Sequence, residues 1–223
     1  MAAIPLNQIT QQGGGDDALF ESICVDLHDK GYSIKPNALP EWLSQPLWKH
    51  VQGLPEEQFQ HAGVGRQEDH TLNNFVRKDV IRWINGDTAA CKAWLDWTSQ
   101  LRLYLNRRLF LGLFEFESHF AHYRPGAFYK THMDAFKGEA NRVISTVAYF
   151  NPDWQLQDGG QLELHVGQNG AENIKVLPCF GTLVTFLSED FPHQVLASNR
   201  DRYSIAGWFR VNSSTLDRVD PLS

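Results

Sequence analysis

The chain has 223 residues, 42% of them hydrophobic and 12% aromatic, and its 20 basic and 26 acidic side chains give a net charge of −6. This composition excludes disordered and fibrous proteins, and it suits one large globular domain that buries roughly 70% of its unfolded surface. The acidic balance disfavours nucleic-acid and membrane partners that bind through a general cationic surface.

The cysteines and the apolar runs indicate the cellular compartment in which the protein is expected. Cys24, Cys91 and Cys179 are odd in number and far apart, so neither a disulfide scaffold nor a zinc ribbon is expected. The first residues lack the features of a signal peptide, and no apolar run approaches the ~18 residues that span a bilayer. We therefore expect a cytoplasmic protein with no nucleic-acid and no membrane partner.

The first predicted element is a flexible tail over residues 1–15, which ends in a polar, glycine-rich stretch with nothing to bury. Apolar residues then recur at helical spacing over residues 16–30. Asp16 or Asp17 can cap the start of this helix, and Gly31 can end it.

Two further helices are expected before Gly112, where the hydrophobic pattern of the sequence changes. One follows Pro40 and is expected to be interrupted at Pro46, while a longer one begins with Asp87 as its cap and ends at about Asn106. Residues 16–111 are thus expected to form a mainly helical support.

Beyond Gly112 the apolar runs become short and are separated by glycine, proline, asparagine and aspartate. Strands are expected at 114–123, 143–150, 161–166, 182–187 and 204–211. We expect an antiparallel β core over residues 112–211, closed or in two sheets, with the helices packed outside. Neither a linker nor a repeat divides the chain, so residues 16–223 are expected to form a single domain.

The first candidate functional residues are in His132-Met133-Asp134. A spacing of two aims both side chains to one face of an extended segment, where an imidazole and a carboxylate can share a metal ion. Such a triplet also arises by chance, so further residues are needed. His193, in Phe191-Pro192-His193, supplies a second imidazole.

Arg202 completes this pattern at the head of the last predicted strand. Two histidines and one carboxylate on one face of octahedral Fe(II) leave three positions, which a bidentate 2-oxo acid and dioxygen can occupy. The planar guanidinium suits the far carboxylate of such an acid. Ser204 and Trp208 point to the same side of the strand as Arg202, because side chains alternate. The alternative to a ligand-binding role is a structural one, in which Arg202 forms a surface ion pair with Asp201 or Glu189.

Several longer motifs occur along the chain in the same order as in a known enzyme family. They are Val76-Arg77-Lys78-Asp79, Tyr123-Arg124-Pro125-Gly126 with Tyr129, Tyr149-Phe150-Asn151-Pro152-Asp153-Trp154, Gly159-Gly160-Gln161-Leu162 and Phe191-Pro192-His193-Gln194-Val195. Over residues 62–211 the chain thereby resembles the Fe(II)/2-oxoglutarate-dependent dioxygenases. Within them it is similar to the prolyl 4-hydroxylases of the hypoxia-inducible-factor hydroxylase type and to their bacterial relatives.

The resemblance implies a mainly β fold with N-terminal helices, in which a double-stranded β-helix (jelly roll) forms the core. It implies His132, Asp134 and His193 as ligands of Fe(II). Arg202 and the hydroxyl of Tyr149 would hold the distal carboxylate of 2-oxoglutarate, and Tyr123 would line the iron end of the pocket. Ser204 and Trp208 would belong to the same co-substrate pocket. The substrate contacts are expected from Arg142, Arg77, Asp79 and Tyr129, with residues 63–79 as a loop that closes over a peptide.

The implied activity is hydroxylation of a prolyl residue in an exposed loop of a folded protein, with release of succinate and CO2 and with ascorbate as the reductant. Elongation factor Tu is the candidate partner for a bacterial source, and the hypoxia-inducible factor, with a role in oxygen sensing, for an animal source. Two alternatives stay open: a hydroxylase of free amino acids or other small molecules, and a non-catalytic 2-oxoglutarate-binding protein.

Some residues argue against neighbouring families or against a role in the site. Asp134 keeps the carboxylate that halide-accepting relatives replace, and Trp208 stands where a nucleic-acid demethylase of the AlkB type would place a second arginine. His119 and His122 are expected not to bind metal, because an odd offset in a strand puts them on opposite faces. Tyr149 and Trp208 could equally be core aromatics.

Overall fold

The computed structural model describes residues 16–62, 76–135, 141–167 and 172–212. Its helices are α1 (Asp16–Lys30), α2 (Glu41–Gln52) and α3 (Ala89–Leu109), and short 3₁₀ turns span Glu56–Gln58 and Leu156–Asp158. The side chains that α1 and α3 bury recur at three and four positions, which is the pattern of a helix packed on one face. Within the described residues, no helix combines the length and the apolar composition needed to cross a membrane.

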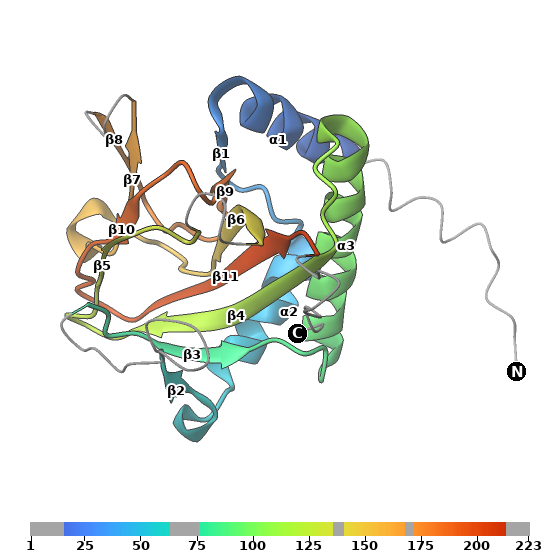
Figure 1. The fold of residues 1–223 in the computed structure, drawn as a ribbon. Helices are drawn as coiled ribbons and strands as arrows, with labels where there is room; N and C mark the ends of the chain where they lie inside the picture. The colour runs from blue at the N-terminus through green and yellow to red at the C-terminus, as the bar shows by residue number, and fades with distance from the viewer. Residues whose placement is uncertain (1–15, 63–75, 136–140, 168–171, 213–223) are drawn as a thin grey trace, which may run out of the picture.

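The strands form two sheets in which every pairing is antiparallel. In spatial order the larger sheet contains β1 (Tyr32–Lys35), β9 (Leu183–Leu187), β6 (Arg142–Tyr149), β11 (Arg202–Arg210), β4 (Glu115–Tyr123), β3 (Val80–Trp83) and β2 (Gln60–His61). The smaller sheet contains β5 (Tyr129–His132), β10 (His193–Val195), β7 (Leu162–Val166) and β8 (Glu172–Val176). The helices lie on one side of the larger sheet and the smaller sheet lies away from them (Figure 1). This is the predicted jelly-roll core.

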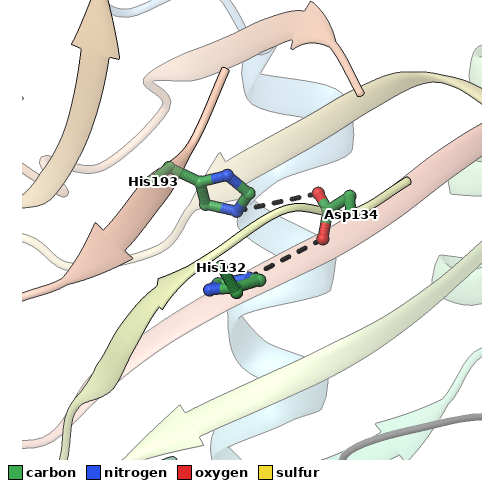
Figure 2. A group of neighbouring side chains, drawn as sticks. All are labelled: His132, Asp134 and His193. Carbon is green, nitrogen blue, oxygen red and sulfur yellow. Dashed lines mark ion pairs between the residues drawn. The ribbon is translucent and has the colours of Figure 1, made fainter. Parts of the chain in front are cut away.

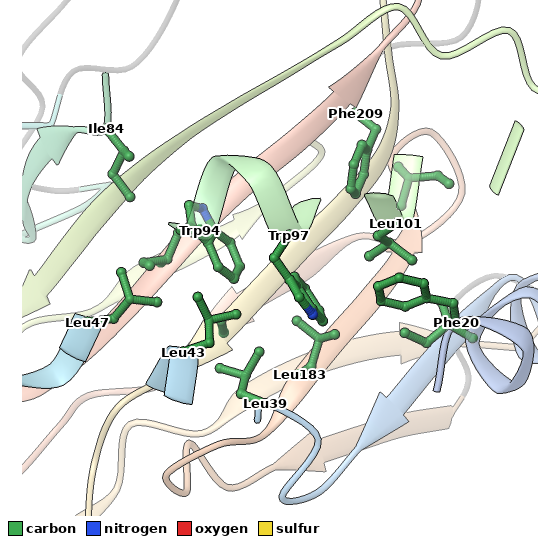
Figure 3. Packing of buried hydrophobic residues seen from close by; sticks show 14 of the residues in the cluster. Phe20, Leu39, Leu43, Leu47, Ile84, Trp94, Trp97, Leu101, Leu183 and Phe209 are labelled. Carbon is green, nitrogen blue, oxygen red and sulfur yellow. The ribbon is translucent and has the colours of Figure 1, made fainter. Parts of the chain in front are cut away.

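Alternation along the central strands creates two apolar layers. One face of the larger sheet supplies Ile144, Ile205 and Phe209, which pack in one cluster with Trp94 and Trp97 of α3. Figure 3 shows Phe209, Trp94 and Trp97 in this layer. The opposite face looks toward the smaller sheet, and residues of both sheets and their loops form a second buried apolar cluster there: Ala62, Ile81, Ala121, Tyr123, Ala127, Tyr149, Leu162, Leu164, Val166, Val176, Val184, Phe186, Phe191 and Val195. The second layer contains the strand faces on which the candidate site residues were expected.

The five strands expected after Gly112 are present, each within two residues of its expected bounds. The expectation of a mainly helical segment up to residue 111 was incomplete, because β1, β2 and β3 come from it and join the larger sheet. These strands have four residues or fewer, too short to show a clear alternation.

Two helix boundaries also differ from expectation. α2 continues through Pro46, because Leu43 and Leu47 bury the same helix face on either side of the proline while Pro46 itself is exposed. α3 is capped by Thr88 and not by Asp87, since the Thr88 side chain accepts a hydrogen bond from the backbone nitrogen of Cys91.

Candidate metal and co-substrate site

The structure brings His132, Asp134 and His193 together at one end of the smaller sheet (Figure 2). His132 ends β5 and lies directly opposite His193, the first residue of β10. The Nε2 atoms of His132 and His193 lie 3.7 Å from Oδ1 and Oδ2 of Asp134, respectively. One possible ligand atom from each residue falls within 4.8 Å of the others, so the three can share one ion.

Backbone carbonyls set the orientation of both imidazoles. The Nδ1 atom of His132 lies 2.8 Å from the carbonyl oxygen of Lys130, and that of His193 lies 3.1 Å from the carbonyl oxygen of Phe191. A carbonyl oxygen can only accept, so Nδ1 carries the proton in each ring and Nε2 keeps its lone pair for a metal. Strand backbone therefore holds both imidazoles in the tautomer that a metal site requires.

The electrostatics of His132 and Asp134 favour a neutral imidazole and an ionised carboxylate. Burial, with His193 nearby, lowers the pKa of His132, so this imidazole is neutral at neutral pH. Burial alone would raise the pKa of Asp134, but His193, His132 and a hydrogen bond from Ser145 outweigh it and lower that pKa. Two imidazoles and one carboxylate are the donor set of a non-haem Fe(II) centre with open positions, and the site fits that metal.

Arg202 lies deeper between the sheets and is only 1% exposed. It donates from Nε to the carbonyl oxygen of Gly160 at 2.8 Å and from Nη1 to Oγ of Ser204 at 3.3 Å. Among the described residues no carboxylate pairs with this guanidinium: Asp201 instead pairs with His122 at 2.7 Å. A buried guanidinium without a counter-charge is costly, so the position is suited to an anionic ligand.

Two tyrosines frame this guanidinium: Tyr149, which was expected beside it, and Tyr123, which was expected at the iron end of the pocket. The Arg202 Cζ atom lies 4.8 Å from the ring centre of Tyr123 and 5.0 Å from that of Tyr149. Burial raises the pKa of Tyr149 to about 12, so its hydroxyl stays protonated beside the Arg202 guanidinium. A protonated hydroxyl beside a guanidinium that has no described acidic partner fits the distal carboxylate of 2-oxoglutarate.

Trp208 lies on the same strand as Arg202, opposite the serine that binds Asp134. It is buried, it stands opposite Ser145 in the β11–β6 register, and it is among the side chains that lower the pKa of Asp134. The guanidinium of Arg142 covers the ring at 3.7 Å and binds Glu117 with two nitrogens, at 2.9 and 2.7 Å. Arg142 is therefore held between Trp208 and Glu117, and its role as a substrate contact stays a prediction.

The other predicted substrate residues form a stack that ends on a metal ligand. Arg77 binds Asp79 through two hydrogen bonds of 2.8 and 2.6 Å and lies 4.3 Å above the ring of Tyr129. Tyr129 stacks on His132 at 3.6 Å with an angle of 13°. Asp79 is 1% exposed and engaged by Arg77, so its carboxylate supports Arg77 and is not open to a peptide. Residues 63–75, most of the expected loop, lie outside the described residues.

Neither His119 nor His122 joins the metal cluster. His119 is buried between the rings of Trp83 and Trp208, at 5.2 and 5.5 Å. His122 stacks on Tyr203 at 4.4 Å and binds Asp201. Both environments agree with the interpretation of these residues as non-ligands.

Several supporting residues were missed by sequence reasoning. The amide of Asn151 binds the start of β11: Oδ1 accepts from the Tyr203 nitrogen at 2.7 Å, and Nδ2 donates to the carbonyl oxygens of Tyr203 and Pro178 at 3.0 and 2.8 Å. Gly160 has φ of +65°, and a Cβ there would lie 3.0 Å from Cδ of Arg202. The Gly159-Gly160 pair was a usable signal, since adjacent glycines mark a tight backbone approach.

Comparison with known proteins agrees with this geometry. The family model of the 2OG-Fe(II) oxygenase superfamily matches residues 118–210. A Pseudomonas putida prolyl-4-hydroxylase is 38% identical, with a TM-score of 0.78 over 87% of this chain and 100% of that chain. A Trichoplax adhaerens prolyl hydroxylase, solved with a peptide of the hypoxia-inducible factor oxygen degradation domain, is 28% identical, with a TM-score of 0.77 over 90% and 93% of the two chains.

A more distant structure shares the fold alone. It is the viral collagen prolyl hydroxylase of Paramecium bursaria Chlorella virus-1 in complex with 2-oxoglutarate, at 15% identity and a TM-score of 0.58 over 82% of this chain and 98% of that one. A jelly roll that carries two histidines and a carboxylate at one end defines an iron and 2-oxoglutarate oxygenase. The chain belongs to the 2OG-Fe(II) oxygenase superfamily, as a dioxygenase of the prolyl 4-hydroxylase type.

Proposed function

We propose that this protein hydroxylates a prolyl residue in an exposed loop of a protein substrate. One 2-oxoglutarate and one O2 would be consumed for each hydroxyl group, with succinate and CO2 released. The observation that carries the proposal is the fully buried Arg202, which has no described acidic partner and shares the inter-sheet space with the metal cluster. A small anionic molecule would complete such an arrangement.

Each residue of the site has a separable task. His132, Asp134 and His193 would hold Fe(II), which when bound supplies the oxygen-activating chemistry. Arg202 and Tyr149 bind and orient the distal carboxylate of 2-oxoglutarate. Val184 and Phe186, both buried, keep water from the walls of this space. The protein thus contributes position and exclusion of solvent.

The rim of the site favours a peptide over a free amino acid. A free amino acid needs an acidic partner for its ammonium group, but Asp79 and Glu117, the acidic groups beside the predicted substrate residues, are already bound by Arg77 and Arg142. A residue within a peptide has no such charge to satisfy. The substrate contacts that we propose are Arg142, Arg77 and Tyr129, with Asp79 as the support of Arg77.

Elongation factor Tu is the candidate substrate that we propose, because the similar enzyme at 38% identity is bacterial. The hypoxia-inducible factor peptide is the ligand of the Trichoplax protein, and it would be the alternative for an animal source. Ascorbate is the reductant that we include to keep iron in the ferrous state.

The test combines the purified protein, Fe(II), ascorbate and 2-oxoglutarate with elongation factor Tu. We expect one species heavier by one oxygen atom, mapped by mass spectrometry to a proline, and no product with Asp134→Ala. Deletion of residues 63–74 should suppress this product and leave slow succinate formation without hydroxylation. Efficient hydroxylation of free L-proline with elongation factor Tu untouched would favour the small-molecule alternative, and absence of any 2-oxoglutarate turnover would favour the binding protein.

A further inference from the structure

Two serine hydroxyls form a chain that ends on the metal-binding carboxylate. Ser145, in the middle of β6, donates from Oγ to Oδ2 of Asp134 at 2.6 Å. The Oγ atom of Ser145 also lies 2.9 Å from Oγ of Ser188, which follows β9. Ser145 is 1% exposed and Ser188 is fully buried, so water does not compete for these bonds.

The direction of this hydroxyl chain follows from the number of protons. A carboxylate can only accept, so the single hydroxyl proton of Ser145 is used on Asp134. The Ser188 hydroxyl must then donate to the Ser145 oxygen. The order is therefore Ser188 to Ser145 to Asp134, and loss of Ser188 acts on Asp134 only through Ser145.

The two serines stand on rigid backbone, whereas Asp134 does not. Ser145 faces Phe186 of β9 and Trp208 of β11 in the register of the larger sheet. The backbone nitrogen of Ser188 donates to the carbonyl oxygen of Val143 at 3.0 Å. Asp134 lies beyond His132, the last residue of β5, so strand pairing does not hold it. The orientation of its carboxylate depends on side-chain contacts.

We propose that Ser145, supported by Ser188, is a positioning residue that makes Asp134 a one-oxygen ligand. The bond to Oδ2 restrains rotation of the carboxylate and leaves Oδ1 for the metal. A carboxylate that bound through both oxygens would take a position that the bidentate 2-oxo acid or dioxygen needs. Groups that orient a ligand in this way commonly change metal affinity by 10–100-fold. The proposal rests on the metal site and does not depend on the prolyl substrate.

Titration of the full-length protein with Mn²⁺ alone, followed by electron paramagnetic resonance, tests the proposal without turnover. Ser145→Ala should weaken Mn²⁺ binding by about 10–100-fold, and Ser188→Ala should weaken it less. In the Ser145→Ala background, Ser188→Ala should add no further loss, because its effect passes through Ser145. Ser145→Thr keeps the hydroxyl and should keep the affinity within about threefold, an order-of-magnitude margin.

Ser33→Ala is the matched control. Ser33 is also fully buried and donates to a carboxylate, Oδ2 of Asp26, at 2.7 Å, but it lies on β1 outside the metal cluster. This variant should bind Mn²⁺ as the wild type does. Unchanged affinity in Ser145→Ala, or an equal loss from Ser188→Ala in both backgrounds, would overturn the proposal. If Ser145→Ala does not fold by circular dichroism, unchanged affinity in Ser188→Ala overturns it instead. A failed elongation factor Tu assay would leave these affinities as predicted.

Discussion

Arg202 donates from Nε to the carbonyl oxygen of Gly160 at 2.8 Å, so main-chain atoms and not an acidic side chain orient this guanidinium. The close approach depends on the glycine: its φ is +65°, and a Cβ would lie 3.0 Å from Cδ of Arg202 and 3.3 Å from Cζ2 of Trp154. A positive charge held by backbone keeps its attraction for an external anion. The contribution of Arg202 to 2-oxoglutarate binding can therefore be measured by substitution.

Arg202→Ala should raise the KM for 2-oxoglutarate by about two to three orders of magnitude, since loss of one partner of a buried charge pair costs on the order of 2–5 kcal/mol. Tyr149→Phe removes one hydrogen bond and should raise it about fivefold, which corresponds to ~1 kcal/mol. Succinate formation against 2-oxoglutarate concentration measures both. Arg200→Ala, which removes an exposed arginine paired with Asp158, is the control and should change little. The reverse ranking of the first two variants would show that the pocket is misplaced.

Alanine at His132, Asp134 or His193 should abolish turnover and weaken Fe(II) binding, because the loss of one of three ligands destroys the facial arrangement. Circular dichroism should show that the fold survives. His28→Ala removes an exposed histidine and should behave as the wild type does. Normal 2-oxoglutarate decarboxylation by Asp134→Ala would exclude this residue as a ligand.

Asn151→Asp should raise the KM for 2-oxoglutarate more than it lowers kcat. The variant keeps the acceptor for the Tyr203 nitrogen but loses both donors and sets a negative charge against the carbonyl oxygens of Tyr203 and Pro178. Since Tyr203 adjoins Arg202, the start of β11 should shift. Asn199→Asp is the control, because Asn199 also donates to a backbone carbonyl, that of Gln157, but is exposed. Equal effects of both variants would contradict a specific role for Asn151.

The free energy of unfolding should fall as the pH is lowered from about 6.5 to about 4. Burial, with the charge of Arg77 as a second cause, lowers the pKa of His119 to about 4, whereas the unfolded chain protonates near 6.5. The unfolded state therefore binds the proton first, and protonation favours unfolding by up to ~3 kcal/mol. Urea unfolding across this range measures the effect.

His119→Gln should flatten this pH dependence without removing it. The pKa values of His50 and His132 are also lowered, so both residues contribute with the same sign. An unchanged slope in His119→Gln would mean that the protonation of this histidine is not linked to folding.

The long elements could be predicted because their patterns extend over several turns or alternations. α1, β4 and β11 are of this kind, with 15, 9 and 9 residues. β10 has only three residues and contains a metal ligand, so its composition reflects chemistry as well as strand pairing. Pro46 was misread because the missing hydrogen bond is on an exposed helix face, where water can replace the donor.

In the site, local spacing could be predicted and long-range contacts could not. His132 and Asp134 share a face through their separation of two residues, and Arg202 stands out as a charge at the head of an apolar strand. The contact of Ser145 with Ser188 joins residues 43 apart, and that of Asn151 with Tyr203 joins residues 52 apart. Such contacts depend on the register between strands, which one sequence does not determine.

The direct cross-strand pairing of His132 with His193 limits how the gene can change in length. Side chains in a strand alternate with a period of two, so the insertion or deletion of one codon within β5 would turn His132 to the opposite face of the smaller sheet. Thr131 or Met133 would then face the ion, and neither is a ligand that Fe(II) prefers. Substitutions can accumulate in this segment, but frame-preserving indels of one residue should be lethal to activity even where the fold tolerates them.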